Sequence, residues 1–328
     1  MDKILTVAIT TYNRKERLLD QLYSLCRQQE YNMIKIIILD NHSNYDVKAA
    51  IVEKFGCEIA DEIEVNINPV NFGMCANLAM PFIYCNTPWL WTLSDDDETL
   101  ADSIATIFKD IRKYPNTIMF KYAIEGGRLD DVEFSSFEQL IDYYYAKKNA
   151  GGHLIFLSNN VYNMRYAMQY YGNTLSNSFC CIAQMLPMFY ALDAKAGIVR
   201  FCSNPLVKYI PPAPGTGYHY LNTAIEISST AMFPFRLSDR YHKKLGFIVC
   251  SGFSHYKLIY CALHEPEKRR GMFLYQQIYS RSFKFSGSVL DKIYHWYFYF
   301  AYLTGIIIPL DIAKQIRTNV RRWFPKFR

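Results

Sequence analysis

The chain of 328 residues is 51% hydrophobic and 20% charged, which is typical of a folded globular protein and excludes a disordered one. Its length predicts one large domain, or a domain with an appendage. The formal net charge is +6, and no acidic residue follows Asp311, whereas six basic ones do: Lys314, Arg317, Arg321, Arg322, Lys326 and Arg328. The six positive charges of this tail equal the formal net charge of the whole chain. The sequence therefore indicates a local basic patch and argues against general nucleic-acid binding.

The nine cysteines form no Cys-x-x-Cys pair and have no regular spacing. Cys180 and Cys181 are neighbours, and adjacent cysteines rarely form a relaxed disulfide. An odd count with mostly apolar flanks predicts reduced thiols in a cytosolic protein. The apolar run from Ile4 to Ile9 is too short for a secretory signal peptide, which agrees with that location.

The first hundred residues alternate between two periodicities. Apolar, β-branched runs predict strands at 4–10, 33–39, 62–67 and 89–93. Helical spacing predicts a helix to about Gln29, with Asn13 as the N-cap of a capping box, and another from Asp46 to Phe55 that stops at Gly56. Strands separated by such helices indicate an α/β fold with a mostly parallel sheet.

The remaining elements follow the same kind of evidence. Beyond residue 100 the patterns predict helices at 100–111 and 137–147, strands at 118–122 and 154–157, two helical stretches separated near Gly172, and a strand pair at 198–210 bent at Pro205. Beyond about Asn222 the chain is predicted to be wholly helical. We therefore expect a catalytic α/β domain over 1–220 and a helical carboxyl-terminal region over 221–328.

Three polar clusters follow predicted strands, at Thr10–Arg14, Asp40–Asn44 and Ser94–Asp97. The carboxyl ends of parallel strands share one sheet edge, where ligands bind. The adjacent carboxylates of Asp95, Asp96 and Asp97 repel one another, so they need a cation, backbone donors or exposure. An acidic surface turn would explain them, but their place beside the other two clusters favours a divalent ion shared with a diphosphate.

Four ordered motifs resemble those of family 2 glycosyltransferases of the GT-A fold. They are Thr10-Thr11-Tyr12-Asn13-Arg14, Asp40-Asn41, Asn68-Pro69-Val70-Asn71-Phe72-Gly73 with Asn77, and Leu93-Ser94-Asp95-Asp96-Asp97. The match is close over about 4–120, loose over 150–220 and weak beyond. The resemblance implies a GT-A (Rossmann-like) mixed, mostly parallel sheet flanked by helices. It also implies an inverting, metal-dependent enzyme that uses a nucleotide-diphosphate sugar, expected to be UDP-linked.

The resemblance also implies a role for each matching position. The nucleotide pocket would be lined by Thr10, Tyr12, Arg14, Asp40, Asn71, Gly73, Asp95 and Asp96. Asp97 would hold Mg²⁺ or Mn²⁺ bridging the diphosphate, with Asp95 near the ribose or a metal-bound water. Asp40 alone is equally consistent with a turn cap, and Asn71 and Gly73 with ordinary turn chemistry.

Two departures from the family pattern affect the chemistry. Many relatives carry a basic residue before Asn77, where this chain has Met74-Cys75-Ala76. Relatives often have an acid pair further along, where this chain reads Phe179-Cys180-Cys181-Ile182-Ala183-Gln184-Met185. An inverting enzyme needs a group to take the acceptor's proton. The candidates are Asp193, which the helix pattern also explains as a helix end, and Asp131, in the loop after Gly126-Gly127.

Other polar residues have both a functional and an ordinary interpretation. His219 follows a Gly-containing loop and is either a metal or phosphate ligand or a plain loop histidine. His153 is either a core or loop histidine or an acceptor contact. Asn159 and Asn160 would hydrogen-bond a sugar hydroxyl, or Asn160 would cap the next helix.

Residues 293–310 are almost continuously apolar, and a span needs about twenty residues. The Tyr and Trp content of this stretch suits the headgroup region. Basic residues then interleave with Ile316 and Val320, which predicts a segment lying on an anionic membrane. The alternatives are a packed helical subdomain or a homodimer interface.

Together these features predict transfer of a sugar to a glycan or a lipid-linked saccharide in bacterial surface-polysaccharide synthesis, at the inner face of the cell membrane. A catalytically silent carbohydrate-binding or scaffold subunit is the alternative from another class. A sugar-phosphate nucleotidyltransferase would need a Gly-rich phosphate loop with a basic residue near the amino terminus, which this sequence lacks.

Overall fold

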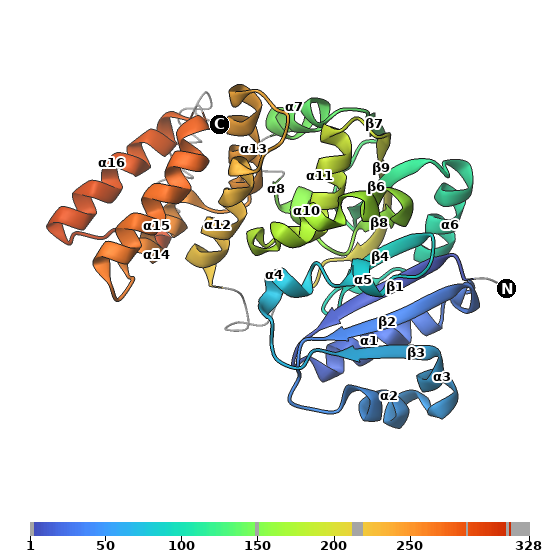
Figure 1. Ribbon diagram of the computed structural model, residues 1–328. Helices are drawn as coiled ribbons and strands as arrows, with labels where there is room; N and C mark the ends of the chain where they lie inside the picture. Colours follow the sequence, from blue (N-terminus) through green and yellow to red (C-terminus); the bar gives the residue numbers. More distant parts are fainter. Residues whose placement is uncertain (1–2, 148–150, 212–218, 287, 313–314, 316–328) are drawn as a thin grey trace. The chain divides into compact units, whose positions relative to one another are not determined.

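The computed structural model describes residues 3–147, 151–211, 219–286, 288–312 and 315 (Figure 1). The chain divides into two compact units. The α/β unit comprises Met1–Gln139 and Phe156–Gly217, and the helical unit comprises Leu140–Ile155 and Tyr218–Arg328. The basic tail residues from Lys314 onward, in which we predicted a membrane-associated segment, lie outside the described residues.

One mixed sheet forms the centre of the α/β unit, in the order β3-β2-β1-β4-β8-β6-β9-β5, with β7 paired to β9. Its strands are β1 Leu5–Thr11, β2 Ile34–Asp40, β3 Ile63–Ile67, β4 Trp89–Ser94, β5 Glu98–Thr99, β6 Thr117–Ile124, β7 Val132–Phe134, β8 Asn160–Asn163 and β9 Ile198–Lys208. The strands β1 to β4 pair in parallel, and β6 pairs in parallel with β9. This arrangement confirms the predicted fold class.

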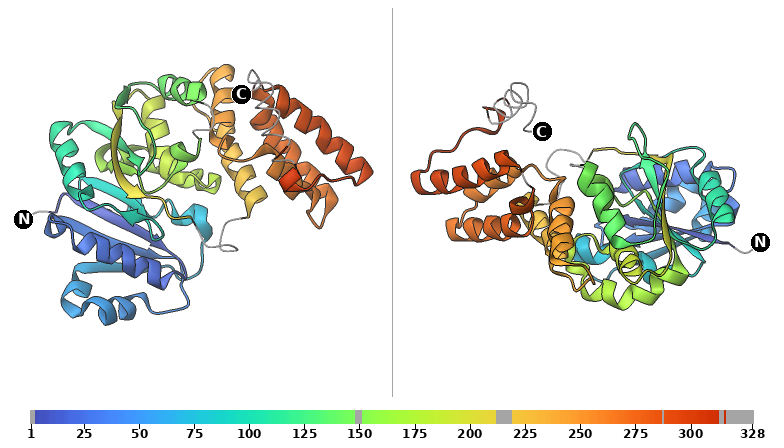
Figure 2. Two further views of the ribbon diagram at one scale, coloured as in Figure 1. Left: turned by 180° about the vertical axis from the view of Figure 1, so that it is seen from behind. Right: turned by 90° about the horizontal axis from the view of Figure 1, so that it is seen from above.

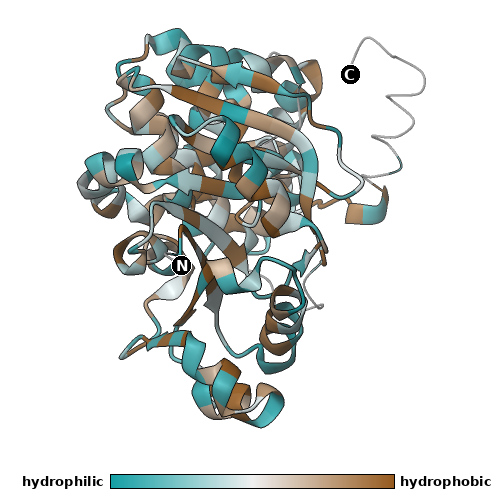
Figure 3. Cartoon of the chain, turned by 90° about the vertical axis from the view of Figure 1, so that its right-hand side faces the viewer, coloured by the Kyte–Doolittle hydropathy of each residue, from teal (hydrophilic) through white to brown (hydrophobic). Residues whose placement is uncertain are grey.

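Helices cover both faces of this sheet (Figure 2). They are α1 Lys15–Cys26, α2 Val47–Phe55, α3 Cys57–Glu62, α4 Gly73–Asn77, α5 Pro81–Tyr84, α6 Ser103–Lys113, α9 Met164–Ala167, α10 Tyr171–Ser176 and α11 Leu186–Asp193, and α7 Phe137–Lys147 runs from this unit into the other. Leu18, Leu22 and Leu25 of α1 recur at helical spacing and are buried against the sheet. The strands carry long hydrophobic stretches (Figure 3), as expected where both faces are covered.

The helical unit contains α8 Gly151–Ile155, α12 Tyr220–Ser228, α13 Asp239–Cys250, α14 His255–Leu263, α15 Lys268–Arg281 and α16 Val289–Thr304. Gly271 lets α15 approach α14 closely, because a Cβ there would lie 2.0 Å from the Ala262 carbonyl oxygen. His255 joins three helices: its Nδ1 lies 2.7 Å from Asp291 Oδ1 and its Nε2 lies 3.1 Å from the Tyr275 hydroxyl. The described residues beyond Asn222 are helical apart from their connections, as predicted.

Three local predictions were wrong. Asn13 does not cap α1: its φ is 54°, and the N-cap is Arg14. Residues 154–157 do not form a strand, because α8 runs to Ile155 and the strand is β8; a short apolar run does not distinguish a buried helix from a strand. The strand pair over 198–210 is one strand, β9, whose register with β6 shifts beside Pro205.

Candidate functional site

The three polar clusters meet at one edge of the sheet, as their positions predicted. In the parallel register Thr11 lies beside Asp40, and Thr10 lies beside Ser94. Asn13 joins two of the strand ends, since its backbone N–H donates to Ser43 Oγ at 2.8 Å. Its own Oδ1 accepts from the Asn44 N–H, also at 2.8 Å. Asn13 therefore links the turn after β1 to the loop after β2.

Asp95 is almost fully buried, with 1% of its surface exposed. Its Oδ2 accepts from Thr11 Oγ1 at 2.7 Å and its Oδ1 from Arg14 Nη1 at 2.8 Å. Burial raises the pKa of Asp95, against the opposing effect of Arg14. Arg14 Nη1 also lies 3.0 Å from Asp96 Oδ2. The guanidinium thus binds two of the three carboxylates, and Asp95 uses both of its oxygens inside the protein.

Asp97 is bound differently from its neighbours. Its Oδ2 accepts from Ser158 Oγ at 2.5 Å, whereas its buried Oδ1 has no hydrogen-bond partner among the described residues. Burial raises the pKa of Asp97 to about 7, although Ser158 and the backbone of Ile210 lower it. A buried carboxylate oxygen without a donor is costly, and such oxygens are ligands that Mg²⁺ and Mn²⁺ prefer. The residues present therefore fit a divalent cation at Asp97.

Ser158 is the residue of this site that the sequence analysis missed. It is fully buried, accepts from the Ser94 N–H at 3.0 Å, and its carbonyl accepts from Trp91 Nε1 at 2.8 Å. Ser158 therefore connects the end of β4 to Asp97. No spacing rule links two residues 61 positions apart, so the signal was absent from the sequence.

Asn159 and Asn160 support this loop from inside. Both are fully buried, and the Oδ1 atom of each accepts from Lys121 Nζ at 2.8 Å. Asn160 Nδ2 also donates to the Phe156 carbonyl at 2.7 Å. Their predicted contact with a sugar hydroxyl is thus wrong for the conformation described, because these side chains face the interior. Asn160 opens β8 and does not cap a helix.

Asp40 is buried and turns the chain after β2. Its Oδ1 and Oδ2 accept from the Ser43 N–H at 3.0 and 3.2 Å. Asp40 therefore makes the hydrogen bonds of a turn-capping aspartate, which is one of its two interpretations from the sequence. Thr10 is half-buried at the end of β1, and Tyr12 just beyond it is 43% exposed. These three predicted nucleotide-binding residues lie at the same edge as the acidic triplet.

Asparagine side chains hold the loop before α4 against the end of β2. Asn71 Oδ1 accepts from Asn41 Nδ2 and from the Gly73 N–H, both at 2.8 Å. Asn41 Oδ1 accepts from the Phe72 N–H at 3.0 Å. Gly73 has a φ of 81°, a conformation that side chains with a Cβ rarely adopt. Asn71 and Gly73 thus shape this loop, as expected from both of their interpretations.

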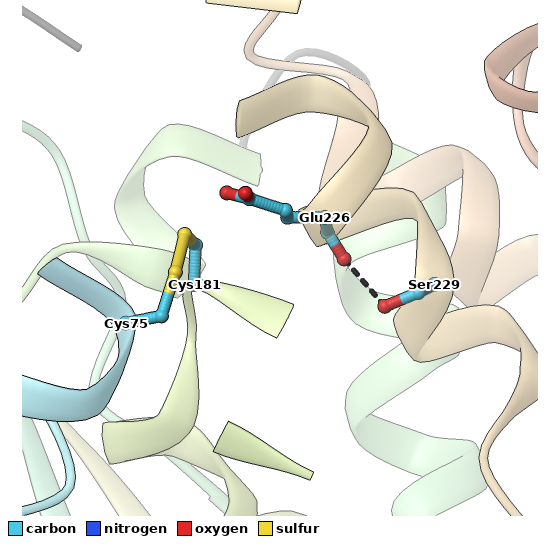
Figure 4. Close-up of a disulfide and its surroundings, with 4 residues drawn as sticks. All are labelled: Cys75, Cys181, Glu226 and Ser229. Carbon is cyan, nitrogen blue, oxygen red and sulfur yellow. Dashed lines mark hydrogen bonds between the residues drawn. A yellow bond between two sulfur atoms is a disulfide. The ribbon is translucent and has the colours of Figure 1, made fainter. Parts of the chain in front are cut away.

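A disulfide joins Cys75 of α4 to Cys181, which follows the 3₁₀ turn Ser178–Cys180 (Figure 4). The prediction that every cysteine is a reduced thiol was therefore wrong. The bond closes a sequence separation of 106 residues, which composition does not reveal. It covalently links the two segments in which the chain departs from the family pattern, 74–76 and 179–185.

The structure does not bring the two predicted base candidates to the acidic triplet. Asp193 ends α11 shortly before the amino end of β9, whereas the triplet lies at the carboxyl edge. Asp131 is exposed, and its Oδ1 and Oδ2 accept from the Ser203 N–H at 2.7 Å and the Ser203 hydroxyl at 3.0 Å, in the middle of β9. These positions argue against either carboxylate as the base.

The two histidines singled out in the sequence belong to the helical unit. His219 is the N-cap of α12: its Nδ1 accepts from the Asn222 N–H at 3.2 Å, and its Nε2 lies 3.6 Å from Glu265 Oε1. His153 lies in α8, 2.9 Å from the Tyr144 hydroxyl. Both sets of contacts match the ordinary interpretations of these residues.

The raised pKa of Asp97 predicts how metal affinity and stability depend on pH. Mn²⁺ affinity should increase as the pH rises through about 7, because the ligand is the ionised carboxylate. The metal-free folded state binds the Asp97 proton more tightly than the unfolded state. The contribution of Asp97 to the free energy of unfolding should therefore fall as the pH rises from about 4 to about 7, which the difference between wild type and Asp97→Asn isolates. Calorimetric titration with Mn²⁺ and thermal melts with EDTA measure both; a flat profile in each would contradict the assignment.

Ser158→Ala should weaken Mn²⁺ binding by about tenfold, an effect typical of residues that orient a metal ligand. The loss of the hydroxyl should also shift the midpoint of binding to higher pH, because Ser158 lowers the pKa of Asp97. Ser158→Thr, which keeps the hydroxyl, should retain most of the affinity. If the pH midpoint of Mn²⁺ binding is unchanged in Ser158→Ala, Ser158 only supports the loop and does not affect the pKa of Asp97.

Comparisons with known proteins identify the family of this chain. The model of the family described as Glycosyl transferase family 2 matches residues 6–183. Abequosyltransferase RfbV of Salmonella typhimurium is 30% identical over 105 residues, which are 32% of this chain and 31% of RfbV, so the chain spans about a third of that curated relative.

Two solved structures show the same fold. S. aureus TarS 1-349 in complex with UDP-GlcNAc has a TM-score of 0.58 at 13% identity, over 86% of this chain and 80% of that chain. Mannosyltransferase PcManGT from Pyrobaculum calidifontis, in complex with GDP-Man and Mn²⁺, has a TM-score of 0.50 at 12% identity, over 94% and 89%. Because the family model covers more than half of the chain, this protein belongs to glycosyl transferase family 2.

Proposed function

We propose that this glycosyltransferase moves a sugar from a UDP-linked donor, with inversion and with the help of Mg²⁺ or Mn²⁺, to a glycan or lipid-linked saccharide. The observation that carries the proposal is the buried Oδ1 of Asp97 at the carboxyl edge of the sheet, which has no hydrogen-bond partner among the residues that the structure describes. The UDP-GlcNAc complex of TarS supports a UDP donor, and the PcManGT complex supports a Mn²⁺ ion beside a sugar nucleotide. The setting, surface-polysaccharide synthesis, rests on the family resemblance and on the basic, aromatic end of the sequence.

The proposed roles follow from the contacts of each side chain. Asp97 would hold the metal ion, which when bound would neutralise the charge that develops on the leaving diphosphate. Arg14 orients Asp95, since it contacts Oδ1 directly, and its charge opposes the burial that raises the pKa of Asp95. With Asp96, Thr10, Tyr12, Asp40, Asn71 and Gly73, these residues would line the nucleotide pocket. His219 is left out of the proposed metal site, because its ring already caps α12.

The positions of the two base candidates lead to a testable prediction. Asp193→Asn and Asp131→Asn should each keep sugar transfer within about threefold of wild type, far less than the roughly hundredfold or greater loss expected for a general base. Initial rates at saturating donor and acceptor measure this. A large fall in kcat for either variant, with the fold retained, would identify that carboxylate as the base after all.

Donor hydrolysis tests the proposed function directly. A panel of UDP- and GDP-sugars is incubated with the protein, with Mn²⁺ or with EDTA, and released nucleotide is measured. We expect turnover of at least one UDP-sugar that EDTA abolishes. If no donor binds or turns over, a silent carbohydrate-binding or scaffold subunit becomes the better explanation; if turnover survives EDTA, the metal assignment fails.

We also propose that the protein works at the inner face of the cell membrane, where a lipid-linked acceptor would be presented. The basic, aromatic end of the sequence supports this location. Among the described residues, no helix is long and apolar enough to cross a bilayer.

A further inference from the structure

The helix α16 exposes a row of large apolar side chains. Its members recur every four or three residues, which places them on one side of the helix. They are Val289, Ile293, Trp296, Phe300 and Leu303, with 49%, 56%, 74%, 52% and 81% of their surfaces exposed. We call this row the α16 stripe.

The opposite side of α16 is already occupied. Phe298 and Ala301 are buried, and the Phe298 ring lies 3.9 Å from that of Tyr275. Asp291 binds His255 of α14 on the same side. The helix is thus apolar on both its packed and its exposed side, a pattern normally found in helices that are covered all round. A continuous exposed apolar row of this size marks a contact surface.

We infer that the α16 stripe is the surface by which this protein lies on an anionic membrane, an inference that rests on the proposed membrane-borne acceptor. Trp296 is at the middle of the stripe, and half-buried Tyr299 lies beside it. Such amphipathic rings favour the headgroup layer. A coiled-coil partner would instead be selected by charged residues flanking the seam. In α16 the charged residues are Asp291 and Lys292, both in the first turn.

The charge of the following sequence fits the same occupant. No acidic residue follows Asp311, and six basic residues do. Each basic residue near an anionic surface strengthens the attraction to that surface. The 16 residues of α16 would extend about 24 Å along the surface. Apolar insertion and basic attraction together give the two signals that stable peripheral binding requires.

Vesicle flotation of the full chain tests this inference. The vesicles contain phosphatidylcholine with or without phosphatidylglycerol. The test variant is Trp296→Glu with Leu303→Glu; the milder pair Trp296→Ala with Leu303→Ala should fall between it and wild type. The matched control is Met232→Glu, an apolar residue that is also mostly exposed (65%), in the 3₁₀ turn Ser229–Met232. Circular dichroism checks the fold of each.

Wild type and Met232→Glu should float with the phosphatidylglycerol vesicles and be released by salt. The double Glu variant should bind the vesicles at least about tenfold more weakly, because it replaces two membrane-inserted apolar side chains by charges. Equal flotation of all variants would overturn the inference. So would a wild-type dimer that the double variant converts to monomer in light scattering, because the stripe would then join two copies of the chain.

Donor hydrolysis on the same preparations separates this inference from the proposed function. The double variant should hydrolyse donor at the wild-type rate, since the substituted residues belong to the helical unit and not to the triplet edge. Flotation without any donor turnover by wild type would reject the proposed function and leave the stripe assignment standing. Donor turnover by wild type, together with flotation that the double variant does not reduce, would reject the stripe assignment and leave the proposed function standing.

Discussion

Asp97→Asn is expected to abolish Mn²⁺ binding and to lower kcat/KM by about a thousandfold or more. The variant removes a carboxylate at the one position of the triplet where a buried oxygen lacks a hydrogen-bond partner among the described residues. Loss of a metal that stabilises the leaving group costs several kcal/mol of transition-state energy, and each 1.4 kcal/mol is about tenfold in rate. Steady-state kinetics and Mn²⁺ titration by electron paramagnetic resonance measure the two effects.

The same variant should be more stable than wild type when no metal is present. Burial raises the pKa of Asp97 to about 7, so above that pH the metal-free folded state holds a poorly solvated carboxylate. An amide removes this cost, and the melting temperature in EDTA above pH 7 should therefore rise. Asp102→Asn is the matched control, because Asp102 is exposed and its side chain does not cap α6. An Asp97→Asn enzyme that keeps both activity and Mn²⁺ affinity would refute the metal assignment.

The opposed effects of Asp97→Asn follow from how the site is built. Three carboxylates lie next to one another in sequence, yet one guanidinium offsets two of them. Asp97 is held by a neutral hydroxyl instead. Stability and function thus make different demands on this position, as is common at sites that bind charged ligands.

The sequence alone was sufficient for the parts of the fold that depend on local pattern. The strands β1, β2, β3 and β4 are marked by apolar runs, and their polar ends necessarily meet because the strands are parallel. The acidic triplet could therefore be placed at the carboxyl edge of the sheet from the sequence pattern alone. The resemblance to a family then predicted which of these polar residues bind the nucleotide or the metal ion.

The rest of the site depends on contacts that no local pattern encodes. Ser158 contacts Asp97 although 61 positions separate them in sequence. The loop of Ser158 is held by Lys121, which is buried although lysine is usually found at the surface. Cys75 meets Cys181 across 106 positions. Asn13 fitted a capping box, but tertiary hydrogen bonds to Ser43 and Asn44 were available instead. Local rules fail here because long-range partners offer the same polar atoms better-placed contacts.

Arg14→Ala is expected to destabilise the fold by roughly 2–4 kcal/mol and to abolish donor binding. It leaves the buried carboxylate of Asp95 without its cation, and breaking a buried pair from one side is costly. The figure lies below that of a fully buried pair because Arg14 is 36% exposed and solvent screens it. Urea unfolding and nucleotide titration measure the two losses. Arg17→Ala is the matched control on α1, since its contacts to backbone carbonyls are long, at 3.4 and 3.5 Å.

The pH dependence identifies Asp95 as the origin of the Arg14→Ala defect. Arg14 lowers the pKa of Asp95 in the folded state, so its removal raises that pKa further above the unfolded value. The stability deficit should be complete at high pH and should shrink as the pH falls and Asp95 becomes protonated. The double variant Arg14→Ala with Asp95→Asn should recover most of the lost stability, because no buried charge is left unpaired. A deficit that is independent of pH and persists in the double variant would mean that Arg14 acts through packing and not through its charge.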